Sequence, residues 1–120
     1  MKNKFKFEKF NVYIKSEHYY SVILNIISNT KIDKNIKDQL KRASLSIVLN
    51  IAEGSGKYTK KDKKNFYIIS RGSVNECVAI LRILNIENKI SKENFNKTYE
   101  YLLEIAKMLS ALIKSIDKRQ

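Results

Sequence analysis

Apolar residues recur at helical spacing in four segments of the chain, separated by short polar stretches. The segments predict helices over about residues 8–28, 33–53, 60–85 and 91–118. No segment keeps the period-two alternation of a strand. Because the connections are short, successive helices are expected to lie antiparallel. We therefore expect an all-α fold: one domain, residues 1–120, forming an up-down-up-down four-helix bundle.

Each predicted helix has an apolar stripe that is expected to face the core. These stripes are Phe10, Tyr13, Ile14, Tyr20, Leu24 and Ile27; Ile36, Leu40, Ala43, Ile47 and Ile51; Phe66, Ile69, Ser73, Cys77, Ile80 and Leu84; and Phe95, Thr98, Leu102, Ile105, Leu109, Leu112 and Ile116. The first three helices carry a second stripe, which includes Tyr19, Leu49 and Tyr67. Apolar side chains left in water are a liability, so self-association is expected, and a ring-shaped homo-oligomer is one permitted form.

The ends of the helices are marked by capping residues and glycines. Asp33, Thr59 and Ser91 are candidate N-caps. Gly54 and Gly56 are expected to end the second helix by supplying a positive φ. Gly72 lies inside the third helix and predicts a close helix–helix approach. Residues 1–8 form either a short extended arm or a frayed helix start.

The chain is strongly basic, with a formal net charge of +12. This charge favours polyanionic partners such as RNA or DNA. The abundance of Lys, Asn and Ile is also what A/T-rich codons produce, so part of the charge has a compositional explanation. No apolar run is long enough to span a membrane, and no signal peptide is recognisable. The lone cysteine, Cys77, is consistent with the cytoplasm.

Basic residues cluster after the second predicted helix, beside an aromatic residue. The candidate nucleic-acid-binding residues are Lys57, Tyr58, Lys60, Lys61, Lys63, Lys64 and Arg71. Lysines at a helix N-terminus oppose the macrodipole, whereas an anionic ligand would meet both the lysines and the free N–H groups there. Tyr58 is placed to stack on a base. The alternative is a merely solvated loop.

Four polar residues are expected to form a structural network near the same turn: Asn50, Glu53, Ser73 and Glu76. A ligand-binding or catalytic role for Asn50 and Glu53 is the alternative. His18 and Cys77 lie on different predicted helices, so no metal site or catalytic triad can be assembled from them. We expect His18 at the surface, Cys77 as inert packing, no enzymatic activity and no cofactor.

Two segments resemble a known family. Ser46 and the block Asn50-Ile51-Ala52-Glu53-Gly54 lie in a segment similar to SxxxNIAEGxGR, and Phe66 to Glu76 resembles FxxIARGSxxE. Both segments are typical of bacterial four-helix-bundle proteins. These include the 23S rRNA intervening-sequence protein and the accessory variability proteins of diversity-generating retroelements. Lys57 stands where the family often has arginine, which keeps the charge without the bidentate fork.

The resemblance implies a homopentameric barrel of four-helix bundles. The retroelement relatives bind nucleic acid and a reverse transcriptase. From the residues and the resemblance together, we expect a non-enzymatic protein that binds the phosphate backbone of RNA or DNA without sequence specificity. The alternative is an adaptor that binds a protein partner, such as a reverse transcriptase, with its basic charge incidental.

Overall fold

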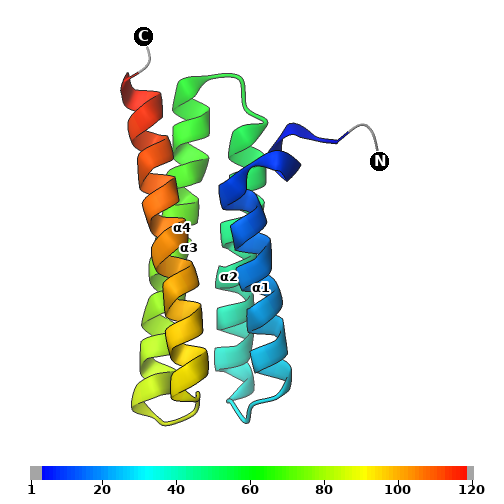
Figure 1. Cartoon of the computed structure of the whole chain (residues 1–120), viewed down its shortest axis with the longest axis vertical. Coiled ribbons are helices and arrows are strands. Elements are labelled where there is room, and N and C mark those ends of the chain that lie inside the picture. Colours follow the sequence, from blue (N-terminus) through cyan, green and yellow to red (C-terminus); the bar gives the residue numbers. More distant parts are fainter. Residues whose placement is uncertain (1–3, 119–120) are drawn as a thin grey trace.

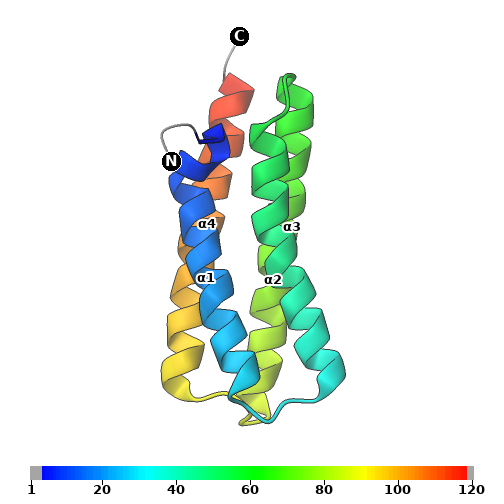
Figure 2. The same cartoon turned by 90° about the vertical axis from the view of Figure 1, so that its right-hand side faces the viewer.

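The computed structural model describes residues 4–118 and contains four long helices and one short 3-10 helix. In chain order they are η1 (Lys6–Lys9), α1 (Asn11–Ser28), α2 (Lys34–Ser55), α3 (Lys60–Ile86) and α4 (Lys92–Lys118). The helices run alternately up and down, and α1 lies beside α4, which closes the bundle (Figures 1 and 2). Within residues 4–118 there is no strand. The predicted all-α four-helix bundle is confirmed.

The first helix begins later than predicted. Instead of starting at Glu8, α1 starts at Asn11, after an extended residue at Phe10 (φ −70°, ψ 127°). The Glu8 carboxylate accepts a hydrogen bond from the Phe5 N–H at 2.8 Å, and the Glu8 N–H donates to the Phe5 carbonyl at 3.1 Å. These two bonds close the tight turn of η1. The N-terminal arm, defined here as residues 4–10, is therefore a fixed turn rather than a frayed helix; the rest of the predicted arm, residues 1–3, lies outside the described residues.

The expected role of Gly54 and Gly56 is wrong, because neither residue has a positive φ. The second helix continues to Ser55, and Gly56 caps it at φ −89°. Gly54 is required by packing instead: a Cβ at this position would lie 2.7 Å from Cε1 of Tyr67, a residue that is only 2% exposed. At Gly72 the expected close approach is absent, because a Cβ there meets no heavy atom of the described residues within 4 Å.

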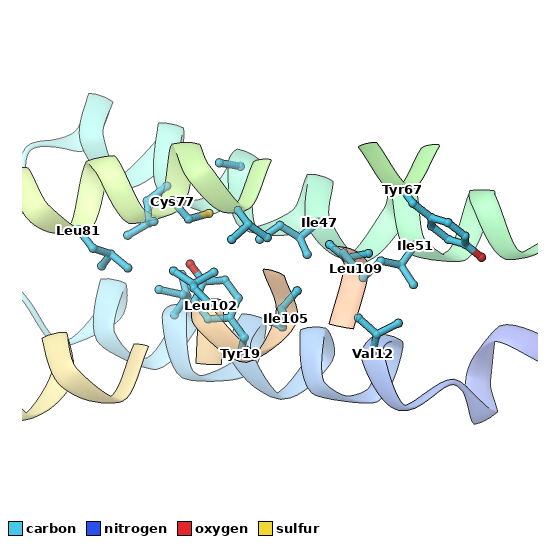
Figure 3. Packing of buried hydrophobic residues seen from close by; sticks show 14 of the residues in the cluster. Val12, Tyr19, Ile47, Ile51, Tyr67, Cys77, Leu81, Leu102, Ile105 and Leu109 are labelled. Atoms are coloured by element: carbon cyan, nitrogen blue, oxygen red, sulfur yellow. The ribbon is translucent and has the colours of Figure 1, made fainter. Parts of the chain in front are cut away.

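The core follows the predicted stripes in α2 and α4 and departs from them in α1. In α1 the second stripe is buried, with Tyr19 and Ile23 fully covered, whereas Ile14 and Leu24 of the expected main stripe are each 38% exposed. In α3 the buried face draws on both stripes. Figure 3 shows side chains from all four helices meeting along the axis.

One layer of the core is polar. The Ser44 hydroxyl donates to the Tyr19 hydroxyl at 3.1 Å and lies 3.5 Å from the Cys77 sulfur. All three residues are fully buried. Burial raises the pKa of Tyr19 well above its usual value, and it also raises the pKa of the Cys77 thiol. Both groups therefore stay neutral near pH 7, which fits the expected packing role of Cys77.

Candidate functional site

Three segments far apart in the sequence meet at one end of the bundle. The N-terminal arm, the α2–α3 turn (residues 56–59) together with the first turns of α3, and the last turns of α4 all lie there (Figures 1 and 2). The arm contacts the end of α2 as well as α1. We call this region the basic end, because it gathers lysines from all three segments.

The turn itself presents its aromatic residue to solvent. Thr59 caps α3, its hydroxyl accepting a hydrogen bond from the Asp62 N–H at 3.1 Å, as the sequence predicts. Tyr58 precedes this cap and is 99% exposed. Lys60 and Lys61 follow it and are exposed as well. A side chain as large and as open as Tyr58 is available to stack on a ligand.

Three lysines of the predicted cluster make contacts within the protein. Lys57 lies 3.6 Å from the Glu53 carboxylate, with its Nζ 5.1 Å from the centre of the Phe66 ring. Lys63 donates to the Ser55 carbonyl at 3.1 Å, and Lys64 pairs with Asp117 at 2.7 Å. The carbonyl end of α2 favours cations, which offsets the cost of placing lysine near the start of α3. These contacts tie the turn to α2, and the start of α3 to α2 and α4.

Arg71 does not lie at the turn. It follows the start of α3 by three helical turns, about 16 Å along the axis at 1.5 Å per residue. Its guanidinium donates to the Ser110 hydroxyl of α4 at 3.4 Å. It lines a shallow cavity together with Lys114 and Asp117, the partner of Lys64. Arg71 therefore extends the basic surface down the α3–α4 flank rather than completing the turn.

Sequence reasoning missed five lysines at the same end. Lys4, Lys6 and Lys9 are exposed on the arm, and Lys114 and Lys118 are exposed near the end of α4. The alternation of Lys and Phe in the arm could be seen in the sequence and indicated a basic segment. The position of the arm could not be inferred from the sequence, because it depends on how the arm folds back onto α2. The basic end is thus larger than the predicted cluster.

The predicted polar network is joined through a residue that was not considered. Asn50 donates from its side-chain amide to the carbonyl and the hydroxyl oxygen of Ser46, at 2.8 and 3.0 Å. Ser46 and Ser73 share a hydroxyl–hydroxyl bond of 2.8 Å that links α2 to α3. Glu53 pairs with Lys57 instead, and Glu76 is exposed on α3. Two of the four residues, Asn50 and Ser73, therefore belong to one helix–helix contact.

The single histidine, His18, is exposed on α1 and lies outside the segments of the basic end. Across residues 4–118, no three His, Cys, Asp or Glu side chains are grouped as metal ligands would be. The helices of this region also lack the length of continuous apolar sequence that a membrane crossing needs.

Comparison with known proteins gives a family and a fold. Residues 8–111 match the family model described as 23S rRNA-intervening sequence protein. Among solved structures, the chain is similar to a protein of unknown function from the S23 ribosomal protein family of Bacteroides thetaiotaomicron. The two chains are 26% identical and superpose with a TM-score of 0.82, covering 86% of this chain and 98% of that one. No curated protein matches.

Proposed function

Because the chain belongs to the 23S rRNA-intervening sequence protein family, we propose that it is a non-enzymatic protein that binds the phosphate backbone of RNA or DNA through its basic end. One observation carries the proposal: the arm, the α2–α3 turn with the start of α3, and the end of α4 lie at the same end of the bundle (Figure 1), and each of them carries lysines. Lysines that neutralise phosphates release condensed counterions, which gives affinity without reading sequence. The proposed location is the cytoplasm.

The two kinds of basic residue have different roles in this proposal. Lys57, Lys63 and Lys64 hold the turn against α2, α3 and α4 through the contacts described above. Lys61 and the arm lysines project into solvent and reach the phosphates. Tyr58 stacks on an unpaired base, which makes single-stranded or looped nucleic acid the preferred form.

A salt series tests the proposal. Binding of the purified protein to a labelled structured RNA and to a DNA duplex is measured by fluorescence anisotropy. If roughly six phosphates are contacted, affinity should fall by about a thousandfold between about 50 and 200 mM salt. Absence of binding to both probes at 50 mM salt would contradict the proposal. It would favour the alternative, an adaptor for a protein partner such as a reverse transcriptase.

We further propose that the protein works as a homo-oligomer, with the pentamer that the family resemblance implies. Support comes from apolar side chains left in water on α2 and α3: Leu45, Ile68, Ile69 and Ile83 are each between 36% and 49% exposed. Gly72 lies among them on α3, with open space where its Cβ would be. Glycine inside a helix costs roughly 0.5–1 kcal/mol relative to alanine, and close approach of a second copy would account for it.

Replacing Gly72 by valine should therefore break the assembly while sparing the fold. Light scattering is expected to give about five subunit masses for the wild-type protein and one for Gly72→Val, with unchanged helical circular dichroism. The control is Leu103→Asn, which alters an apolar side chain on α4 that is 45% exposed. A monomeric wild-type protein, or a Gly72→Val protein that still assembles, would contradict the proposed homo-oligomer.

A further inference from the structure

A hollow lies at the basic end, between the N-terminal arm and the last turns of α2. Its volume is about 350 Å³, within the roughly 300–1,000 Å³ of small-molecule pockets. It is lined by Phe5, Phe7, Leu49, Ala52, Glu53, Gly56 and Lys57. Glu53 and Lys57 form an ion pair with each other, but that pair does not explain the aromatic and apolar residues of the lining.

One wall of the hollow is aromatic and held in place. The rings of Phe5 and Phe7 stack with their centres 6.1 Å apart and their planes at 24°. The Phe7 ring makes an edge contact with the Tyr13 ring at 4.8 Å, and the backbone of Phe5 is held by its two hydrogen bonds with Glu8. Phe5 is nevertheless 76% exposed. A ring fixed on a turn but open to water presents a flat face on which another flat ring can stack.

The facing side combines an apolar floor with one carboxylate and one ammonium. Leu49, which is 52% exposed, and Ala52 form the floor. Glu53 and Lys57 stand at the rim, 3.6 Å apart. The Glu53 side chain is 59% exposed, so its carboxylate is accessible to a donor from outside. These three groups complement the parts of a nucleotide. The aromatic ring can stack on the base, the carboxylate can accept hydrogen bonds from N–H groups of the base, and the ammonium can pair with a phosphate.

We propose that this hollow binds one unpaired guanine of a bound strand. The base stacks on Phe5 and lies over Leu49, while the Glu53 carboxylate accepts from N1–H and from the exocyclic N2 amino group. Lys57 then faces the neighbouring phosphate. The inference rests on the proposed nucleic-acid binding and adds to it a base preference, which phosphate contacts alone do not give.

Guanine is singled out by its hydrogen-bonding edge. It presents two adjacent N–H donors, which meet the two oxygens of one carboxylate. Adenine and cytosine place an acceptor nitrogen beside their amino group, and uracil flanks its single N–H with carbonyls. In each of these three bases an acceptor would face a carboxylate oxygen. Guanine within a duplex has this edge already paired, so the base must come from a single strand or a loop.

The test compares single-stranded RNAs that differ at one base. A fluorescein-labelled 15-nucleotide strand of uridines is measured beside the same strand with one central guanosine, adenosine or inosine, the last of which lacks the N2 amino group. The guanosine strand should bind about tenfold more tightly than the all-uridine strand, in keeping with the worth of one stacked, hydrogen-bonded base. The inosine and adenosine strands should lose most of that gain.

Variants locate the preference in the hollow. Phe5→Ala and Glu53→Gln should each bring the guanosine and all-uridine strands to the same affinity. The matched controls are Tyr99→Ala and Glu100→Gln, an aromatic and a carboxylate on the first turns of α4 at the opposite end of the bundle; both should keep the preference. Equal, salt-dependent binding of all four strands by the wild-type protein would overturn the guanine pocket alone. Failure of every strand to bind would overturn the phosphate-binding function as well.

Discussion

Reversing Lys4, Lys6 and Lys61 to glutamate is expected to weaken RNA binding by roughly 10²–10³-fold at about 0.1 M salt. Each phosphate contact contributes about 0.9 logarithmic units of affinity per tenfold change in salt, so three lost contacts also flatten the salt dependence by nearly three units. These lysines are exposed on the arm and at the start of α3. The variant avoids Lys63 and Lys64, whose contacts with Ser55 and Asp117 help to hold the turn. Anisotropy titrations across a salt series measure both effects.

The control changes the net charge by the same amount at the other end of the molecule. Lys31, Lys34 and Lys89 are exposed near the α1–α2 and α3–α4 connections. Their reversal to glutamate should cost far less affinity, because screening limits their effect to about 8–10 Å at such salt concentrations. Equal losses in the two triple variants would mean that the total charge matters rather than its place. A triple variant at the basic end that binds like the wild type would remove this end from the proposal.

Replacing Gly54 by valine is expected to lower the free energy of unfolding by about 1–3 kcal/mol, the usual cost of overpacking a core. The added Cβ would lie 2.7 Å from Cε1 of Tyr67 and 3.1 Å from Cβ of Phe66. Neither neighbour yields easily, because one is a buried ring and the other is fixed to the backbone of α3. The pairing of α2 with α3 would loosen where the helices approach the basic end. Urea denaturation followed by circular dichroism measures the change.

Gly56 supplies the matched control for Gly54. A Cβ at Gly56 would make only ordinary contacts, 3.7 Å from the Glu53 carbonyl, and φ there suits any residue. Gly56→Ala should therefore leave the free energy of unfolding within about 0.5 kcal/mol of the wild-type value, as for other surface substitutions. If Gly54→Val unfolds no more easily than Gly56→Ala, then Tyr67 moves aside and the contact does not restrict position 54.

Helical spacing was sufficient to predict the four helices and the buried face of α4, which has a single stripe. In α2 the expected main stripe is also the buried one, although that helix carries a second stripe. In α1 two offset stripes both have helical spacing, and Tyr19 lies on one while Ile14 lies on the other. Which of the two stripes is buried depends on where α2 and α4 lie, and the spacing of residues within one helix gives no information about that. The same limit applies to Gly54, whose need for a small side chain arises from Tyr67 on another helix.

The sequence revealed those residues of the candidate site that are neighbours along the chain. It did not reveal those that come together only in the folded structure. The run from Lys57 to Lys64 was visible as a cluster. Which of those lysines contact Ser55, Asp117 or Glu53 was not, since those contacts depend on tertiary packing. Ser46 was recognised as part of a family segment but not as a member of the polar network, because a serine within a helix has no partner that the sequence reveals. Its bond to Ser73 emerges only when α2 and α3 are placed side by side.

The buried hydroxyl and thiol groups of Tyr19, Ser44 and Cys77 select one alignment of the helices along the bundle axis. Leucine and isoleucine layers tolerate a slide of one helical turn, since one apolar side chain replaces another. A slide of α1 would instead carry the Tyr19 hydroxyl away from Ser44 and into an apolar layer. An unsatisfied buried hydroxyl costs about 1–3 kcal/mol, which disfavours the shifted packing. The arm precedes Tyr19 on the same chain segment, so this layer deep in the core also sets the height at which Phe5 and Phe7 meet the end of α2.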